Sequence, residues 1–409
     1  MKSLRSLGPA IIVAAVVCGP GSILSASKVG ASFGYSMTWA VVLAVALMIG
    51  ATSLAARVGV GYRGTPCEEL SNRLGRGAGL ALGVVIFIVC AGFQASNNLA
   101  VALVGDDFLG GHGLLAATVL TAALILVVLR APNLYAVVER TMKALVLLMV
   151  LAFLASFLAS KPSMPDAVSG LVPRMPDAKS GGFLAVVGLM ATTFSIAGAF
   201  YQAYLVRDRG WGPDDVRAGA RDSIIGILIL GAITLVIVFT AAATFFGTEP
   251  KTELRSVTDL ARQFEAVFGK WARPVFGVGL LAGALSSFLV NAMIGGQFLA
   301  DGLGRGRDMG SGGARWATVA ALLVGYLGCL AGRTTNFDPV TLILIAQAST
   351  VLGGPLLAGT LLWLGTRRSL HAAARPPRWV IALGALGFLV TLVLSWKTIS
   401  QKFLPMIFG

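Results

Sequence analysis

Charged side chains are scarce in this sequence. Asp, Glu, Lys and Arg together make up 12% of its 409 residues, whereas soluble domains carry roughly 25%. Hydrophobic residues reach 56%, and the mean hydropathy is +0.84. Because a water-exposed surface needs many more charged groups than this, the composition excludes an ordinary soluble protein.

Signatures of several function classes are missing as well. The four cysteines have no paired metal-ligand spacing, which predicts neither a disulfide framework nor a zinc site. No Gly-x4-Gly-Lys-Ser/Thr phosphate-binding loop occurs, and no apolar run carries a nucleophile beside a base. The net charge of +14 comes from Lys and Arg residues in short loops rather than on one face. We therefore predict no cofactor, no nucleic-acid partner, no ATP-driven pump and no enzyme activity.

Apolar runs of about 20 residues recur along the whole chain, and each can cross a hydrocarbon layer of about 30 Å as a helix. They predict an all-α integral membrane protein of about eleven helices, in one domain that covers residues 1–409. The lipid bilayer is its expected surrounding. The expected spans lie near residues 7–29, 37–56, 78–104, 113–129, 142–160, 182–206, 223–246, 274–300, 315–332, 340–364 and 378–396.

The first apolar run follows Lys2 and Arg5, as in a signal peptide. Gly19-Pro20 interrupts it and no small-residue cleavage pattern is convincing, so we expect it to be the first span. With the N-terminus in the cytoplasm, most Lys and Arg residues fall in cytoplasmic loops, as the positive-inside rule requires. The sequence thus predicts a protein of a bacterial inner membrane with a cytoplasmic N-terminus, and a monomer is compatible with it.

The first span contains a helix-breaking sequence, Gly19-Pro20-Gly21-Ser22, near its middle. Pro20 has no N–H to donate and crowds the preceding turn, and the two glycines resist helix formation. Backbone groups freed by a break are tolerated at membrane depth only where they face protein or a water-filled cavity. A packing kink is the alternative, since Gly and Pro are common in membrane helices. We interpret the break as the binding site of a secondary transporter.

The sixth span, residues 182–206, is a second candidate because small and hydroxyl residues fill its middle. Small residues also serve close helix packing, so this signal is weaker. The first and sixth spans would be equivalent members of two five-helix halves, the arrangement of inverted-repeat transporters. Other polar side chains in the spans can line a pathway or tie helices together, namely Gln94, Asn97, Asn98, Ser286, Ser287, Asn291 and Gln347.

No Asp, Glu or His lies in the middle of an expected span. An intramembrane carboxylate is the usual means to neutralise a cation or to relay a proton. A bare transition metal would therefore find no counter-charge, and only oxygen and amide dipoles remain. Such ligands suit hard or partly hydrated ions better than soft metals. We assign no metal ligand from the sequence.

Three segments carry a family resemblance that covers nearly the whole chain. Their residues are Gly8-Pro9, Gly19-Pro20-Gly21-Ser22, Gly34-Tyr35, Gly279 to Ser287, Gly296-Gln297, and Gln347 with Pro355. Together they resemble the Nramp family of divalent-metal transporters, whose first span carries an Asp-Pro-Gly-Asn break, whose eighth is rich in Gly and Ser, and whose tenth bears a Gln. The resemblance implies the leucine-transporter-type fold, with inverted repeats of five helices at about 7–160 and 182–364 and one extra helix at about 378–396.

The resemblance also implies a substrate site that departs from the family pattern. Gly19 and Ser22 stand where the family has its metal-ligating Asp and Asn. The family's Met-Pro-His falls near Ser195-Ile196-Ala197, and its proton-linked Asp falls near Asn98. Charge, soft donor and proton acceptors are thus absent from the implied substrate-binding residues, which are Gly19, Pro20, Gly21, Ser22, Ser195, Ala197, Gly198 and Gln347.

These departures favour hydrated Mg²⁺ or a similar dication over proton-coupled uptake of Mn²⁺ or Fe²⁺, because the Nramp-related magnesium transporters resemble this case in relaxing the sulfur ligand and the proton coupling. Two other functions stay open. The same fold could carry a small organic solute such as an amino acid, whose carboxylate the backbone amides of Gly21 and Ser22 would hold. A non-transporting membrane sensor on a degenerate transporter scaffold is the third hypothesis, and the missing ligands motivate it.

Overall fold

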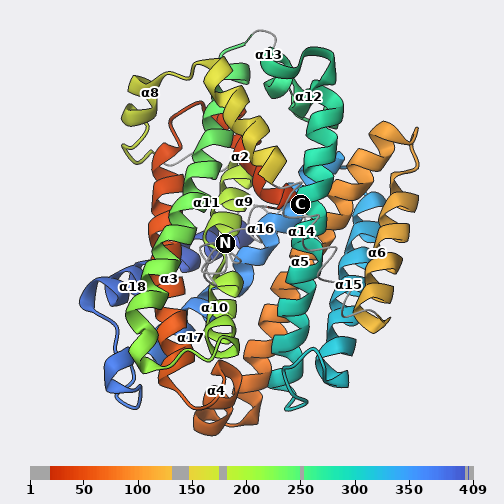
Figure 1. Ribbon diagram of the computed structural model, residues 1–409. Coiled ribbons are helices and arrows are strands. Elements are labelled where there is room, and N and C mark those ends of the chain that lie inside the picture. Colours follow the sequence, from red (N-terminus) through yellow and green to blue (C-terminus); the bar gives the residue numbers. More distant parts are fainter. Residues whose placement is uncertain (1–18, 131–146, 175–181, 249–252, 401–403, 405–409) are drawn as a thin grey trace, which may run out of the picture.

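The structure, a computed structural model, describes residues 19–130, 147–174, 182–248, 253–400 and 404. These residues form helices and connecting loops, with no β-strand among them. Nine helices within the same ranges are long and apolar enough to cross a membrane. The predicted all-α membrane architecture is therefore confirmed for the described part of the chain (Figure 1).

Most of the expected spans form single continuous helices. Several begin or end a turn or two outside the apolar run, because the polar helix ends extend beyond it. These helices are α3 (Thr38–Gly61), α5 (Arg76–Phe108), α6 (Gly113–Arg130), α11 (Val216–Phe245), α14 (Ala272–Gly302), α15 (Gly312–Arg333) and α18 (Arg378–Thr398).

Two expected spans are interrupted. The sixth divides into α9 (Phe183–Thr193) and α10 (Ile196–Asp208), and the tenth divides into α16 (Pro339–Ser349), the 3-10 turn η5 (Thr350–Gly353) and α17 (Gly354–Thr366). Apolar periodicity does not reveal these breaks, because the residues on both sides of each break are equally apolar.

The first and fifth spans are described in part. α2 (Pro20–Phe33) follows the predicted break, and a helix at Leu147–Ser160 covers most of the fifth span. The beginning of the first span, with Gly8-Pro9 and Cys18, lies outside the described residues. Short helices occupy the two ends of the bundle, α4 (Pro66–Leu74) at one end and α8 (Met164–Ser169), α12 (Val257–Ala261) and α13 (Glu265–Phe268) at the other (Figure 1).

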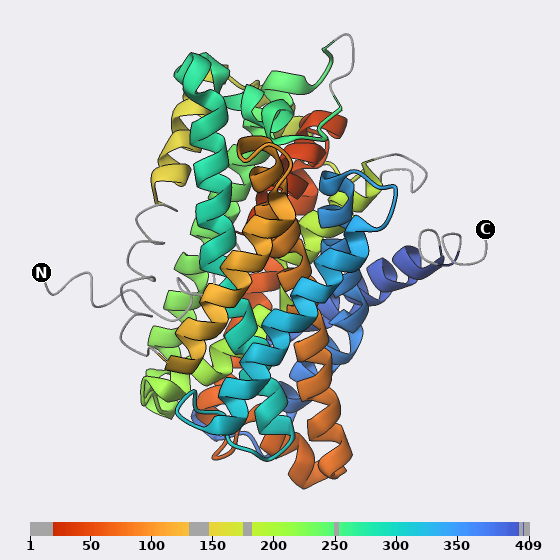
Figure 2. The ribbon, with the colours of Figure 1, turned by 90° about the vertical axis from the view of Figure 1, so that its right-hand side faces the viewer.

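α5 and α14 form the centre of the bundle and pack against each other along their length. Glycines allow this approach: a Cβ atom at Gly83 would lie 2.5 Å from the Phe298 carbonyl oxygen. α6 and α15 lie side by side on the outside of this pair (Figure 2). On the opposite side α2 packs against α11 and α9, where a Cβ at Gly30 would lie 2.2 Å from the Val238 carbonyl oxygen. Small residues at such contacts are typical of membrane helix packing.

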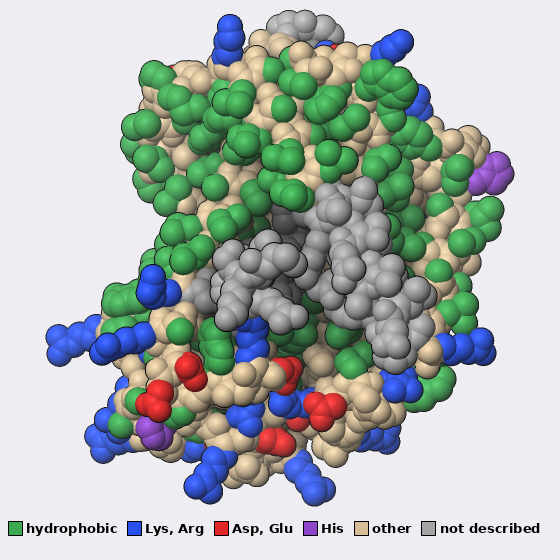
Figure 3. Space-filling model, in the orientation of Figure 1, with side chains coloured by type: hydrophobic (Ala, Val, Ile, Leu, Met, Phe, Trp, Pro, Cys, Tyr) green, Lys and Arg blue, Asp and Glu red, His purple; other side chains and the backbone are tan. Residues whose placement is uncertain are grey.

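The outside of the bundle is apolar. Figure 3 shows hydrophobic side chains over the upper and middle part of one face and charged side chains at the α4 end. Large hydrophobic side chains are exposed on α6, on the Leu147–Ser160 helix and on α18, among them Val119, Leu158 and Trp396. Such a surface matches lipid rather than water, as the composition predicts.

Candidate functional site

α2 begins at the break that the sequence predicts. Gly19 is the N-cap, with extended backbone (φ −84°, ψ 179°), and Pro20 is the first helical residue. The Ser22 and Ile23 amides donate to the Gly19 carbonyl oxygen at 3.1 and 3.2 Å. Within the described ranges no side chain caps the helix at Gly19, and the positive end of the α2 dipole lies at this residue.

The sixth span breaks without a proline. α9 ends at Thr193, and Phe194 leaves the helical region with φ −100° and ψ 62°. Ser195 then caps α10, because its hydroxyl accepts a hydrogen bond from the Gly198 amide at 3.3 Å. The break brings the negative end of the α9 dipole and the positive end of the α10 dipole to one place.

A polar cavity of about 20 Å³ lies where the two breaks meet. Five of the eight predicted substrate-binding residues line it, namely Gly19, Ser22, Ser195, Gly198 and Gln347. Three of the six predicted pathway residues also line it, namely Asn97, Ser287 and Asn291. Phe93 and Thr192 complete the wall and were outside the predicted set. The structure thus brings together side chains from α2, α5, α9, α10, α14 and α16.

Gln347 packs directly against Gly21. A Cβ atom at Gly21 would lie 1.8 Å from Gln347 Nε2, so a side chain at position 21 and Gln347 in this position exclude each other. Gln347 Nε2 donates to the Ser96 hydroxyl at 2.7 Å. Its Oε1 has no hydrogen-bond partner in the described part of the chain, although the residue is only 2% exposed. A buried acceptor without a partner costs free energy, so Gln347 Oε1 is a candidate ligand-binding atom in the wall of the cavity.

Ser287 fills the space beside Gly19. A Cβ atom at Gly19 would lie 2.4 Å from Ser287 Oγ, a separation far shorter than van der Waals contact. Any side chain at position 19, a carboxylate included, therefore requires Ser287 to move.

The described residues that line the polar cavity carry no formal charge. Over the described ranges, no three His, Cys, Asp or Glu side chains come together as a metal site. The groups that the cavity offers are hydroxyls, amides and the backbone at two helix breaks. This arrangement can bind an ion through dipoles or a polar molecule through hydrogen bonds.

Three predicted pathway residues do not line the cavity and form hydrogen bonds within or between helices. Gln94 Nε2 donates to the Phe288 carbonyl oxygen, which ties α5 to α14. Asn98 Oδ1 accepts from the Thr121 hydroxyl at 2.9 Å, which ties α5 to α6. The Ser286 hydroxyl donates to a carbonyl oxygen of its own helix at 3.0 Å. A role of these three in a pathway stays a prediction.

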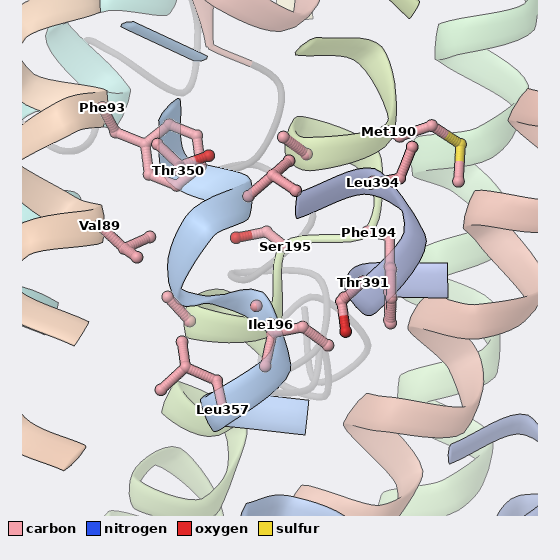
Figure 4. Close-up of a pocket in the computed structure, with 14 residues that line it drawn as sticks. Val89, Phe93, Met190, Phe194, Ser195, Ile196, Thr350, Leu357, Thr391 and Leu394 are labelled. Atoms are coloured by element: carbon pink, nitrogen blue, oxygen red, sulfur yellow. The ribbon is translucent and has the colours of Figure 1, made fainter. Parts of the chain in front are cut away.

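An apolar cavity of about 30 Å³ adjoins the polar one and shares Phe93 and Ser195 with it. Ala197, which was predicted to bind substrate, lines this second cavity. Figure 4 shows Val89 and Phe93 on one side of it and Phe194, Thr391 and Leu394 on the other. Apolar groups of a ligand would find contacts here, and ions would not.

Two charged residues of the membrane helices were missed by the sequence analysis, which examined carboxylates and histidines in the middle of spans. Lys28 is half-buried in α2, and the acidic groups that act on its charge are Asp338, Glu253 and Asp259. Asp301 is 8% exposed in the last turn of α14. A Lys inside an apolar run and an Asp directly after one are the sequence signals that point to them.

A family model described as natural resistance-associated macrophage protein-like, Nramp, matches residues 10–401. The chain belongs to the Nramp family. One Nramp relative, the divalent metal cation transporter MntH of Pectobacterium carotovorum, is 26% identical over 400 residues, which cover 96% of this chain and 92% of the relative. MntH of Mycobacterium tuberculosis is 25% identical over 414 residues, with the same coverage of 96% and 92%.

Solved structures of transporters have the same fold. A mutant of the Eremococcus coleocola manganese transporter superposes with a TM-score of 0.82 at 18% identity, covering 100% of this chain and 89% of that one. Mhp1, a nucleobase-cation-symport-1 family transporter, gives 0.52 at 13% identity, covering 96% and 93%. The predicted Nramp resemblance and the leucine-transporter-type fold class are confirmed.

Proposed function

We propose that this Nramp-family protein is a secondary transporter of a divalent cation, which binds in the polar cavity between the two helix breaks. The observation that carries the proposal is the buried, unpaired Gln347 Oε1 in a cavity lined by hydroxyl and amide groups. The names of the relatives support it, since two are divalent metal cation transporters and one solved structure is a manganese transporter.

We infer that the cation is Mg²⁺ or a similar hard ion that keeps part of its water. Mg²⁺ prefers oxygen ligands and usually retains several waters, and the lining residues that the structure describes include no thioether, imidazole or carboxylate. One water needs about 10–15 Å³ of such a cavity, so the 20 Å³ present hold an ion with at most one water. A complete hydration shell requires the cavity to widen.

Transport without proton coupling is part of the proposal. Asn98 stands near the place of the family's proton-linked Asp. Its amide nitrogen donates to the Gln94 carbonyl oxygen in the same helix, and its amide oxygen accepts from the Thr121 hydroxyl of α6. An amide neither gains nor loses a proton near neutral pH.

The distribution of Lys and Arg among the loops supports one orientation in the membrane. We propose that the N-terminus is cytoplasmic, which puts the α4 end of the bundle in the cytoplasm of a bacterial cell.

A small organic solute is the second candidate, and the apolar cavity favours it. A zwitterion bound in the polar cavity would place an apolar group against Phe93 and toward Phe194. The two candidates differ in what they need, because a dication requires converging oxygens and a carboxylate requires converging donors.

Flux into liposomes that contain the purified protein tests the proposal. We expect uptake of Mg²⁺, no uptake of amino acids, and a reduced rate in Ser287→Ala, which removes a hydroxyl from the cavity wall. Ser223→Ala is the matched control, because this buried hydroxyl donates to the Gly219 carbonyl oxygen of its own helix and does not line the cavity. Amino-acid uptake would establish the second candidate. Mn²⁺ binding below millimolar concentration in calorimetry would contradict the assignment to hard ions, and no uptake of either class would favour a sensor.

A further inference from the structure

α10 and α14 both run from the polar cavity to the α4 end of the bundle. Between the cavity and that end their side chains meet in an aromatic cluster of Phe200, Tyr204 and Phe298, each at most 1% exposed. The Phe200 and Phe298 ring centroids lie 6.1 Å apart, edge to face, and those of Tyr204 and Phe298 lie 4.2 Å apart. The cluster closes the space between the two helices.

A polar group lies directly behind this cluster. The Tyr204 hydroxyl donates to the Asp301 carboxylate at the end of α14. The same hydroxyl lies 3.8 Å from Sγ of Cys67, which is fully buried in α4, and Cys67 Sγ lies 3.9 Å from the Phe298 carbonyl oxygen. Three helices thus meet at this point, where α4 provides the thiol of Cys67, α10 the phenol of Tyr204, and α14 the carboxylate of Asp301.

α10 is attached differently to its two sides. Toward α3, Arg207 Nη1 donates to the carbonyl oxygens of Gly59, Tyr62 and Gly64 at 3.2, 2.9 and 2.9 Å, and the two helices pack along their length. Toward α14, α10 is held among the described residues by side chains only: the aromatic cluster, the Tyr204 bond to Asp301, and the Arg307–Asp208 ion pair at the helix end. A movement of α10 together with α3 therefore keeps the Arg207 bonds and breaks this one set of side-chain contacts.

The nearby charges lie at the rim of this group. Arg307 lies 5.5 Å above the Tyr204 ring and pairs with Asp208 at 3.0 Å. Asp301 itself has no ion-pair partner among the described residues, and its carboxylate accepts hydrogen bonds from the hydroxyls of Tyr204 and Thr65. Burying a carboxylate is costly unless it is hydrogen-bonded, so loss of the Tyr204 bond favours the state in which water reaches Asp301.

We propose that Tyr204, Asp301 and Cys67 form an inner gate, which closes the cavity toward the α4 end and opens when α10 moves away with α3. Alternating access requires a contact that forms in one state and breaks in the other. A hydroxyl-carboxylate bond suits this task, because it is strong when buried and water can replace it when exposed. The inference rests on the proposed transport function, although none of its three residues lines the cavity.

Cys67 supplies a built-in reporter of the inner gate. Burial and, next, the Asp301 carboxylate raise the pKa of the Cys67 thiol well above its ordinary value. The closed gate therefore keeps the thiol both covered and protonated, and only an open gate exposes it to a thiol reagent.

The test measures the rate at which N-ethylmaleimide modifies Cys67 in the full-length protein in liposomes, with the other three cysteines replaced by Ala. We expect Tyr204→Phe to raise this rate roughly tenfold, the order expected for loss of a hydrogen bond to a charged group. Tyr326→Phe is the matched control, since its hydroxyl bonds to Thr118 at 2.6 Å on the outside of the bundle. It should leave the rate unchanged.

A second protein that keeps only Cys90 separates gating from loosening of the fold, because Cys90 is buried in α5 outside this group. If Tyr204→Phe raised the modification rate of Cys90 as much as that of Cys67, the inner gate would be refuted. An unchanged modification rate at Cys67 would refute it as well. Asp301→Ala should raise the rate at least as much as Tyr204→Phe, because it also removes a carboxylate that raises the pKa of the Cys67 thiol. The double variant should react no faster than Asp301→Ala alone. Additive effects would contradict a shared bond.

The readout is independent of the transported solute. Faster modification of Cys67 in Tyr204→Phe without any Mg²⁺ flux would refute the proposed cation and leave the inner gate standing. Mg²⁺ flux together with an unchanged modification rate of Cys67 in Tyr204→Phe would support the proposed cation and refute the inner gate.

Discussion

Gly21→Ala tests the central contact of the candidate site. The new Cβ would lie 1.8 Å from Gln347 Nε2 and 2.4 Å from its Cδ, so Gln347 must leave its position against α2. In leaving, it gives up the bond from Nε2 to the Ser96 hydroxyl. The unpaired Oε1 moves with it, and the cavity loses the acceptor that we assign to the cation.

The expected cost follows from these contacts. Overpacking of a filled interior costs about 1–3 kcal/mol, and loss of the hydrogen bond to Ser96 adds about 0.5–1.5 kcal/mol. Ala has a higher helix propensity than Gly, which stabilises the folded state by about 1 kcal/mol. We expect the free energy of unfolding to fall by roughly 1–3 kcal/mol, while cation flux falls much further because the site itself is displaced.

Thermal unfolding and flux into liposomes measure the two effects separately. Gly77→Ala is the matched control, because a Cβ at this helical position would meet no atom within 4 Å among the described residues. Its stability should be equal or higher and its flux unchanged. Adding Gln347→Ala to Gly21→Ala should restore stability without restoring flux. Normal flux in Gly21→Ala would refute the assignment of Gln347 and α2 to the site.

Further predictions concern charge and coupling. Gly19→Asp should bind Mn²⁺ in calorimetry only when combined with Ser287→Gly, which clears the space for the carboxylate; binding by Gly19→Asp alone would show that Ser287 is no obstacle. Lys28→Gln should lower the KM for a dication several-fold at low salt and less at high salt, because Lys28 lies about 13 Å along α2 from Gly19 by helical rise and repels cations. An unchanged KM would mean that Lys28 does not act on the pathway. Cation uptake should leave a pH dye inside the liposomes unchanged, whereas acidification in step with uptake would contradict the interpretation of Asn98.

The helices and the break at Gly19 could be predicted because their causes are local. An apolar run of sufficient length specifies a span wherever it occurs, and Pro20 between two glycines weakens a helix in any context. The break before α10 has no such local cause, since Ser195 resembles any small polar residue in an apolar run. Its effect depends on the hydrogen bond to Gly198, which shows only in the folded chain.

The roles of polar side chains were equally beyond the sequence. Gln94, Asn97 and Asn98 lie on neighbouring turns of α5 and have the same chemistry, yet only Asn97 lines the cavity. The other two face carbonyl and hydroxyl partners on other helices. Asp301 meets Tyr204 from a different helix 97 residues away in sequence, a distance over which periodicity carries no information.

The close fit of Ser287 against Gly19 has a consequence for how this site can change. A side chain at position 19 and Ser287 in its present position exclude each other, because the two would occupy the same space. Asp at position 19 alone collides with Ser287, and Gly at position 287 alone leaves a hole beside Gly19. A carboxylate can therefore enter this wall of the cavity only through two coordinated substitutions, whose effects on stability and on cation binding should not add.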